Sequence, residues 1–111
     1  MTAKSRDVSA GRMYAIELRV MRTRLLILLD HCYPRYLDEI EIGKCDEINH
    51  GLEAIRRELY YLDQKGLIIA KEIADRRLSA ALTAKGRDFL AGDVAEVGLV
   101  PASDFDYSGP N

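Results

Sequence analysis

The sequence predicts a mainly α-helical fold that carries one β-hairpin. Its 111 residues fit one domain, and a hydrophobic content of 48% is enough for one core. Two long segments place apolar residues at three- and four-residue steps, as amphipathic helices do. Two short segments rich in β-forming residues flank a polar turn. We expect a flexible N-terminus over 1–11, a folded domain over 12–92 and an acidic, irregular C-terminal tail over 93–111.

The first helix is predicted to run as far as Cys32 and to end before Pro34. The residue that precedes a proline disfavours helical angles, so the helical pattern stops there. One apolar stripe follows this helix and consists of Tyr14, Leu18, Met21, Leu25, Leu28, Leu29 and Cys32.

A second apolar stripe lies on roughly the opposite side of the same helix and consists of Met13, Ile16, Val20 and Ile27. A small domain rarely leaves such a stripe in water. We therefore predict a homodimer in which this stripe forms a two-fold symmetric interface. The alternative is that the tail folds back over the stripe with apolar residues drawn from Val94, Val97, Leu99, Val100, Phe105 and Tyr107.

Two further helices are expected before the hairpin. Residues 37–45 predict a short helix with Leu37 and Ile40 inward, and with Asp38, Glu39 and Glu41 outward in solvent. Residues 46–49 then form a turn, and Asn49 is expected to cap the third helix. The third helix has a clean apolar stripe of Ile48, Leu52, Ile55, Leu59 and Leu62. Gly66 is expected to end it.

A hairpin and a last helix complete the order. Strands are predicted over 67–73 and 78–82, with the polar turn 74–77 between them. Thr83 is expected to cap a helix over 84–90, which 91–92 then close. Three helices followed by a hairpin and a fourth helix are the element order of a winged helix-turn-helix domain.

Two segments carry a resemblance to a known family. The segment Leu59-Tyr60-Tyr61-Leu62-Asp63-Gln64-Lys65-Gly66-Leu67-Ile68 resembles the end of a winged-helix recognition helix and its first wing strand. The segment Leu82-Thr83-Ala84-Lys85-Gly86-Arg87-Asp88-Phe89-Leu90 resembles the exit from the second wing strand. Both are similar to MarR, PadR and ArsR-like transcription regulators.

The resemblance extends through 91–92 and 97–101 to small winged-helix proteins of Mu-like bacteriophages and prophages. It covers about residues 18–101. The phage group usually has a basic residue before the proline, whereas this chain has Val100 before Pro101. The resemblance implies a DNA-binding role or a role in phage assembly.

The charge distribution favours a nucleic-acid partner for one part of the chain. The net charge is −2, but residues 49–87 hold eight Lys or Arg and five acidic residues. Residues 88–111 hold five acidic residues and no Lys or Arg. A basic segment is able to dock on phosphate while an acidic one faces elsewhere.

In a winged helix the third helix enters the major groove, so its outward residues are the candidate DNA contacts. They are Asn49, His50, Glu53, Arg56, Arg57, Tyr60 and Gln64. Arg57 suits a guanine, because its fork can bond two acceptors at once, and Gln64 suits an adenine. Arg76 and Arg77 at the wing tip suit the phosphate backbone. The alternative is a solvated helix face and an ordinary polar turn.

Other classes of function find little support in the sequence. No pair of ligands has the spacing C-x-x-C, so His31, Cys32, Cys45 and His50 do not predict a metal site. No nucleophile elbow or phosphate loop predicts an enzyme, and no cofactor is expected. No apolar run is long enough to cross a membrane, and no signal core follows Met1, so we expect a cytoplasmic protein without a membrane partner.

These observations lead to two hypotheses of function. The first is a DNA-binding transcriptional regulator of phage or prophage type, with the third helix in the major groove of double-stranded DNA and the wing on phosphates. The second is a non-catalytic winged-helix module that binds another phage protein during assembly or packaging. The basic segment favours the first hypothesis, while the acidic pI of 5.7 and Glu53 favour the second.

Overall fold

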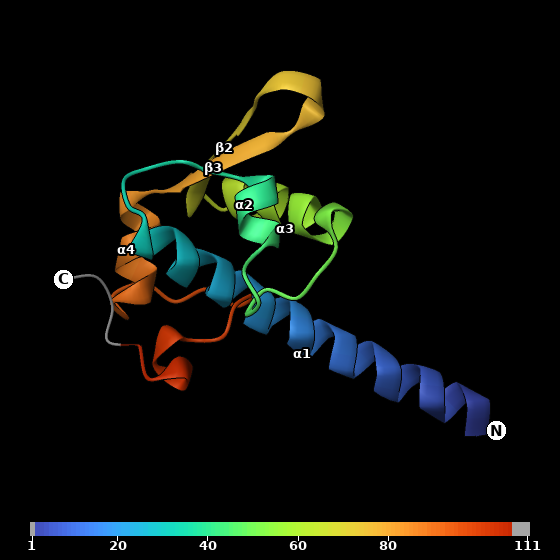
Figure 1. Cartoon of the computed structure of the whole chain (residues 1–111). Helices are drawn as coiled ribbons and strands as arrows, with labels where there is room; N and C mark the ends of the chain where they lie inside the picture. Colours follow the sequence, from blue (N-terminus) through green and yellow to red (C-terminus); the bar gives the residue numbers. More distant parts are fainter. Residues whose placement is uncertain (1, 108–111) are drawn as a thin grey trace.

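Helix α1 (Thr2–His31) is the longest element, and the other elements gather around its C-terminal half (Figure 1). The computed structural model describes the backbone of residues 2–107 and the side chains of residues 12–107. Strand β1 (Leu37–Asp38) and helices α2 (Glu39–Gly43) and α3 (Leu52–Gln64) follow α1. Strands β2 (Ile68–Glu72) and β3 (Leu78–Leu82) form the hairpin, with the 3-10 turn η1 (Ala74–Arg76) at its tip. Helix α4 (Ala84–Leu90) and the 3-10 turn η2 (Ala102–Phe105) end the described chain.

Helix α1 begins earlier than the apolar periodicity predicted. The sequence predicted a flexible segment over 1–11, but the backbone is helical from Thr2 onward. No proline interrupts residues 2–31, and the single glycine Gly11 is tolerated within a helix. The helix ends at His31, before Pro34, as predicted.

The sheet is antiparallel, with the strand order β1-β3-β2. The predicted hairpin is confirmed, and its register pairs Ile68 with Leu82 and Glu72 with Leu78. Strand β1 was not predicted, because two residues show no periodicity of their own. Its pairing of Leu37 with Ala80 ties the α1–α2 connection to the far edge of the hairpin.

Helix α2 differs from the prediction at its start and in its buried face. Asp38 caps it, since its side chain accepts a hydrogen bond from the Ile40 N–H at 2.8 Å. The sequence predicted Ile40 inward and Glu39 outward, but Glu39 is 1% exposed and Ile40 is 38% exposed. Glu39 and Ile42, which are one helical turn apart, form the buried face of α2. The predicted solvated position of Glu39 is therefore wrong.

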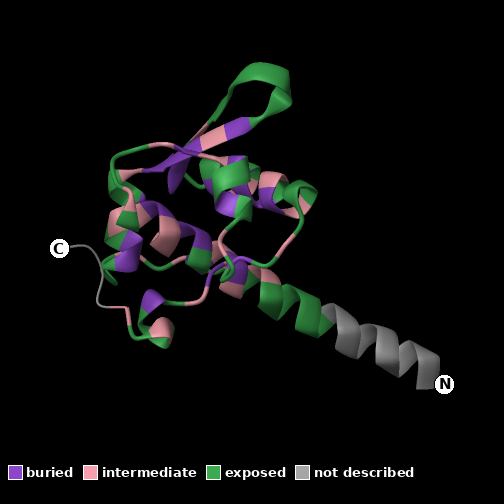
Figure 2. Ribbon diagram, viewed as in Figure 1, coloured by how far each residue is buried: buried purple, intermediate pink, exposed green. Residues whose placement is uncertain are grey.

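The core lies between α1, α3, the sheet and α4 (Figure 2). Of the α3 stripe, Ile55, Leu59 and Leu62 are fully buried, as predicted, while Leu52 in the first turn is exposed. Gly66 ends the helix with a positive φ of 77°, a conformation that glycine adopts without strain.

The tail packs back onto α1 and belongs to the folded unit as far as Tyr107. The Thr23 hydroxyl donates to the Val100 carbonyl at 2.5 Å, and Arg22 donates to the Gly98 carbonyl at 3.0 Å. Leu99 and Ala102 are buried in the core. The domain therefore extends beyond residue 92. Within its described part, residues 93–107, the tail has no regular secondary structure apart from η2.

Candidate nucleic-acid interface

The outward face of α3 gathers four of the predicted DNA contacts around one shallow depression. Glu53, Arg56, Arg57 and Tyr60 line it. Gln64 is exposed one turn further along the helix. The i, i+3 and i, i+4 spacing of an α-helix puts these side chains on one surface.

Arg57 is an exposed arginine on this face of α3. Its side chain is 60% exposed, and its guanidinium donates to the Tyr14 hydroxyl at 3.0 Å. Its Nε lies 3.5 Å from a carboxylate oxygen of the buried Glu58. These contacts orient the guanidinium while leaving donors open to a ligand in solvent.

Arg56 has a structural partner that sequence reasoning missed. It forms an ion pair with the buried Glu39 across 2.7 Å, and Glu39 also accepts the Leu78 N–H at 2.5 Å. Burial alone raises the pKa of Glu39, but the hydrogen bonds from Arg56 and the Leu78 N–H, with the Arg56 charge, outweigh it and hold the pKa below the ordinary 4.5. Arg56 therefore joins α3 to α2 and β3 while its side chain stays 36% exposed.

Asn49 and His50 lie ahead of α3 rather than in its first turn. Gly51 occupies the N-cap position without a side-chain hydrogen bond, so the predicted cap at Asn49 is wrong. Asn49 instead has a positive φ of 47°, which asparagine tolerates better than most residues. A ring nitrogen of His50 lies 2.5 Å from the Ile48 carbonyl oxygen. Both residues line a depression against α1, beside Ile16 and Val20, and neither lines the depression that contains Arg57.

The two wing arginines have different surroundings. Arg76 and Asp75 both adopt positive φ values in η1 and are exposed at the tip. Arg77 forms an ion pair with Asp38 at 2.8 Å, which joins the hairpin to β1. Of the two wing arginines, Arg76 is therefore the one exposed at the tip, whereas Arg77 is held by Asp38.

A buried ion pair between Arg22 and Glu58 joins α3 to α1. The Arg22 Nε donates to Glu58 at 2.5 Å, and the Arg22 guanidinium lies 3.8 Å from the centre of the Tyr61 ring. Glu58 is 2% exposed. Arg22 thereby links α1, α3 and the tail carbonyl of Gly98. The charged residues of this link were visible in the sequence, but their pairing across 36 positions was not.

The second apolar stripe of α1 is only partly covered. Met13 and Ile16 are exposed, and Val20 is half-buried. Ile27 is half-buried and lies beside Phe105 and Tyr107 of the tail. The tail therefore covers one end of the stripe, as the alternative interpretation expected, and leaves the other end in solvent.

The described residues form neither a cluster of metal ligands nor a membrane-spanning helix. Cys45 donates from its thiol to Glu47 at 2.9 Å, and this bond, with burial, raises the pKa of Cys45 above its ordinary value. Within residues 12–107, no three His, Cys, Asp or Glu side chains gather as metal ligands would. Among the described helices, none combines the length and the hydropathy that crossing a bilayer requires.

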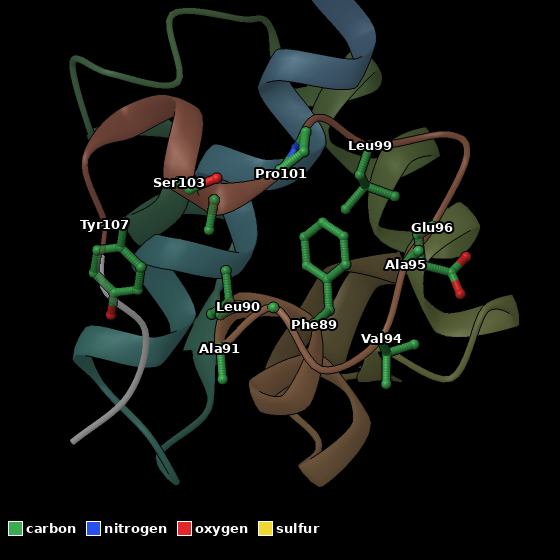
Figure 3. A pocket seen from close by; sticks show the side chains of 12 residues that line it. Phe89, Leu90, Ala91, Val94, Ala95, Glu96, Leu99, Pro101, Ser103 and Tyr107 are labelled. Carbon is green, nitrogen blue, oxygen red and sulfur yellow. The ribbon is translucent and has the colours of Figure 1, made fainter.

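Two cavities flank the tail. The first, of about 410 Å³, lies at the C-terminal end of α4. Figure 3 shows the Phe89 ring at its centre, with Leu99, Pro101 and Val94 around it. The second, of about 400 Å³, lies between α1, the α2–α3 loop and η2, and we call it the α1–tail cavity. Its lining residues are Arg24, Ile27, Leu28, His31, Cys45, Glu47, Ile48, Phe105 and Tyr107.

Tyr107 separates the two cavities and lines both. Its hydroxyl donates to Asp30 of α1. Burial, this hydrogen bond and the charge of Asp30 raise the pKa of Tyr107 to about 12, so the hydroxyl stays protonated at neutral pH. The tail is thus fastened to the C-terminal end of α1.

Comparisons of the chain with protein-family models, with curated proteins and with solved structures found no significant match in any of the three.

Proposed function

We propose that this chain is a winged helix-turn-helix protein of phage or prophage type that binds double-stranded DNA in the cytoplasm and regulates transcription. The observation that carries the proposal is the outward face of α3, where Arg57 and Tyr60 are exposed on a helix held by buried ion pairs. A helix of this kind fits the major groove and brings side chains to base edges.

The topology supports the winged-helix assignment. A short strand between the first two helices pairs with the second hairpin strand, so the hairpin leaves the body beside α3 (Figure 1). Lys71 and Arg76 are exposed on this hairpin. They supply the positive charge that a wing needs on the phosphate backbone.

The proposal includes a homodimer built on residues 13–20 of α1. The exposed Met13 and Ile16 and the half-buried Val20 recur at three- and four-residue steps. A stripe of this kind packs well on a second copy of itself across a two-fold axis. A dimer would offer two α3 helices to successive turns of the major groove. No catalytic step and no cofactor are part of the proposal.

Fluorescence anisotropy with labelled DNA from around the protein's own gene tests the proposal. We expect binding that persists at physiological salt and weakens with a steep salt dependence, because counterions leave the phosphates. Arg57→Ala should weaken binding to the preferred sequence, by about 1–3 kcal/mol for a lost bidentate base contact. Arg76→Ala/Arg77→Ala should weaken binding to all sequences alike.

Arg19→Ala is the matched control, because Arg19 is an exposed arginine of α1 that is not among the proposed DNA contacts. Equal losses in the Arg19 and Arg57 variants would remove α3 as the reading helix. Absence of any binding at low salt would refute the DNA proposal. That result would favour the second hypothesis, in which the domain binds another protein. The acidic Glu53 on the outward face of α3 is compatible with that role.

A further inference from the structure

The uncovered stripe of α1 has the spacing of a coiled-coil seam, and we call it the α1 seam. It consists of Met13, Ile16 and Val20, which follow one another at steps of three and four residues, as the apolar positions of a heptad do. Met13 is 64% exposed and Ile16 is 56% exposed. The next position would be Thr23, which is buried and donates to the Val100 carbonyl of the tail. The seam that is open to a partner therefore ends at Val20.

Charged residues border the α1 seam on both sides. Arg12 and Arg19 are seven residues apart and lie along one side, and Glu17 and Arg24 lie along the other. All four side chains are exposed. Among the described residues, neither Arg12 nor Glu17 forms an ion pair through its side chain. Arg12 and Glu17 lie on opposite sides of the seam, so they do not reach each other within one helix.

These charges distinguish the two ways in which a second copy of α1 is able to pack on the seam. In a parallel pair, the Arg12 side of one helix faces the Glu17 side of the other. Arg12 and Glu17 then occupy the g and e positions of the heptad, whose residues form ion pairs between helices. In an antiparallel pair the two-fold axis crosses the helices, so each side faces its own counterpart. Arg12 and Arg19 would then meet arginines, which favours the parallel pair.

A parallel pair also brings Arg19 of one copy toward Arg24 of the other. The body of the protein holds the Arg24 side chain away from this contact and balances its charge. One of its N–H groups donates to the Glu47 carbonyl at 3.3 Å, and its guanidinium carbon lies 5.5 Å from the centre of the Phe105 ring. The negative charge of the Glu47 carboxylate acts on the same guanidinium. The ion pairs of Arg12 with Glu17 therefore decide the orientation.

The α1 seam borders the depression between α1 and the α2–α3 loop. Ile16 and Val20 of the seam line this depression together with Asn49 and His50. A second copy that packs on the seam also covers the depression. Asn49 and His50 would then lie at the edge of the dimer interface, although the sequence predicted them as DNA contacts.

We propose that residues 12–20 of α1 pair with the same residues of a second copy as a short parallel coiled coil, in which Arg12 of each copy binds Glu17 of the other. The inference rests on the homodimer of the proposed function and specifies its orientation. Each body surrounds the C-terminal part of its own α1, so a parallel pair places both bodies at the same end of the coiled coil (Figure 1). Both α3 helices are then available to one DNA duplex, as paired half-sites require.

Sedimentation equilibrium of full-length charge variants tests the orientation. We expect Arg12→Glu to raise the Kd of the dimer about tenfold, because each exposed ion pair becomes a repulsion. Glu17→Arg should raise it to a similar extent, and Arg12→Glu/Glu17→Arg should restore the Kd of the natural chain. Arg19→Glu is the matched control, because it makes the same charge change on the same side of the seam and should not raise the Kd. An antiparallel pair would give the opposite sign, with a lower Kd for Arg12→Glu.

Oxidative cross-linking gives a second readout that does not depend on charge. In a parallel pair the two Met13 side chains are neighbours across the seam, so Met13→Cys should form a dimer linked by a disulfide. Arg19→Cys should stay uncross-linked, because the parallel pair places the two copies of residue 19 on opposite sides of the coiled coil. The natural chain, which has Cys32 and Cys45 as free thiols, provides the background for both variants.

The outcomes separate the orientation from the dimer itself. A cross-link in Arg19→Cys without one in Met13→Cys, or a double charge variant that is not restored, would overturn the parallel pair and leave the dimer in place. A natural chain that stays monomeric would overturn both. Circular dichroism of each variant reports whether it is folded, so weaker association is not confused with unfolding. None of these outcomes depends on DNA binding, which the anisotropy experiment tests separately.

Discussion

Two carboxylates, Glu58 and Glu39, lie in the interior, and each is neutralised by an arginine from a different element. Glu58 joins α3 to α1 through Arg22, and Glu39 joins α2 to α3 through Arg56. A buried charge is tolerated only while its partner and hydrogen bonds remain. Both pairs therefore fix the position of α3.

Removing Arg22 should be costly because Glu58 would stay buried without its closest cation. We expect Arg22→Ala to lower the free energy of unfolding by about 3 kcal/mol. This is the low end for a broken buried pair, since Arg57 still lies 3.5 Å from Glu58. Urea denaturation measures the loss. Arg19→Ala, on the same helix, should stay within about 0.5 kcal/mol of the natural chain. Equal stability of the two variants would contradict the role assigned to Arg22.

The Glu39 pair predicts a loss of stability in acid. The folded pKa of Glu39 lies below its ordinary 4.5, so the stabilisation is present above about 4.5. This stabilisation is lost as the pH falls through the pKa of Glu39 in the folded state. The reason is that Glu39 is protonated at a higher pH in the unfolded chain than in the folded one. We expect Glu39→Gln to be less stable than the natural chain at pH 7. The difference in urea midpoint should shrink below pH 4.5, and a constant difference from pH 7 to pH 3 would contradict the assignment.

At the scale of elements, α4 depends on a close approach that only glycine permits. Gly86 is buried within the helix, and a Cβ there would collide with the Leu67 carbonyl oxygen and the Leu82 side chain. Helix propensity alone predicts that Gly86→Ala stabilises the chain by up to about 1 kcal/mol. The packing predicts the opposite sign, a loss of about 1–3 kcal/mol from overpacking.

Thermal or urea unfolding of Gly86→Ala decides between these signs. Gly51→Ala is the control, because a Cβ at Gly51 meets no atom within 4 Å. It should change stability by less than about 1 kcal/mol through the N-cap alone. A stabilised Gly86→Ala variant would show that α4 does not pack against Leu67 and Leu82 as closely as the structure shows.

The elements that the sequence predicted well are those with a period of their own. Helix α3 and the hairpin show regular spacing of apolar residues, and Thr83 caps α4 as expected, accepting the Gly86 N–H at 3.1 Å. Strand β1 and the burial of Glu39 were missed because both depend on partners far along the chain. Leu37 pairs with Ala80, and Glu39 needs Arg56. Local patterns contain no information on such pairs.

The same distinction applies to the candidate site. Exposed positions on α3 followed from the buried stripe, so Glu53, Arg57 and Tyr60 were predicted where the structure places them. Asn49 was misplaced because the helix begins three residues later. The α1–tail cavity was not predicted at all, since it needs three segments to meet and an irregular tail gives no periodic signal.

At the scale of the whole molecule, the body buries the C-terminal part of α1 and leaves residues 12–17 exposed (Figure 2). A helix is stabilised in proteins mainly by packing of its apolar face, and the exposed segment 12–17 offers Met13 and Ile16 for that purpose. The tail packs only on the half near Asp30. A second copy of the chain would complete the packing and also provide the symmetry that paired DNA half-sites require.

Ile16→Glu should therefore break the dimer without unfolding the body, because the charge lies in the interface of the dimer but in water in the monomer. We expect sedimentation to show a dimer for the natural chain and a monomer for Ile16→Glu at the same concentration. Ile69→Glu changes an isoleucine of similar exposure, 44% against 56%, on β2 and should remain a dimer. A natural chain that sediments as a monomer at high concentration would remove the dimer. A dimer that persists in Ile16→Glu would place the interface elsewhere than on α1.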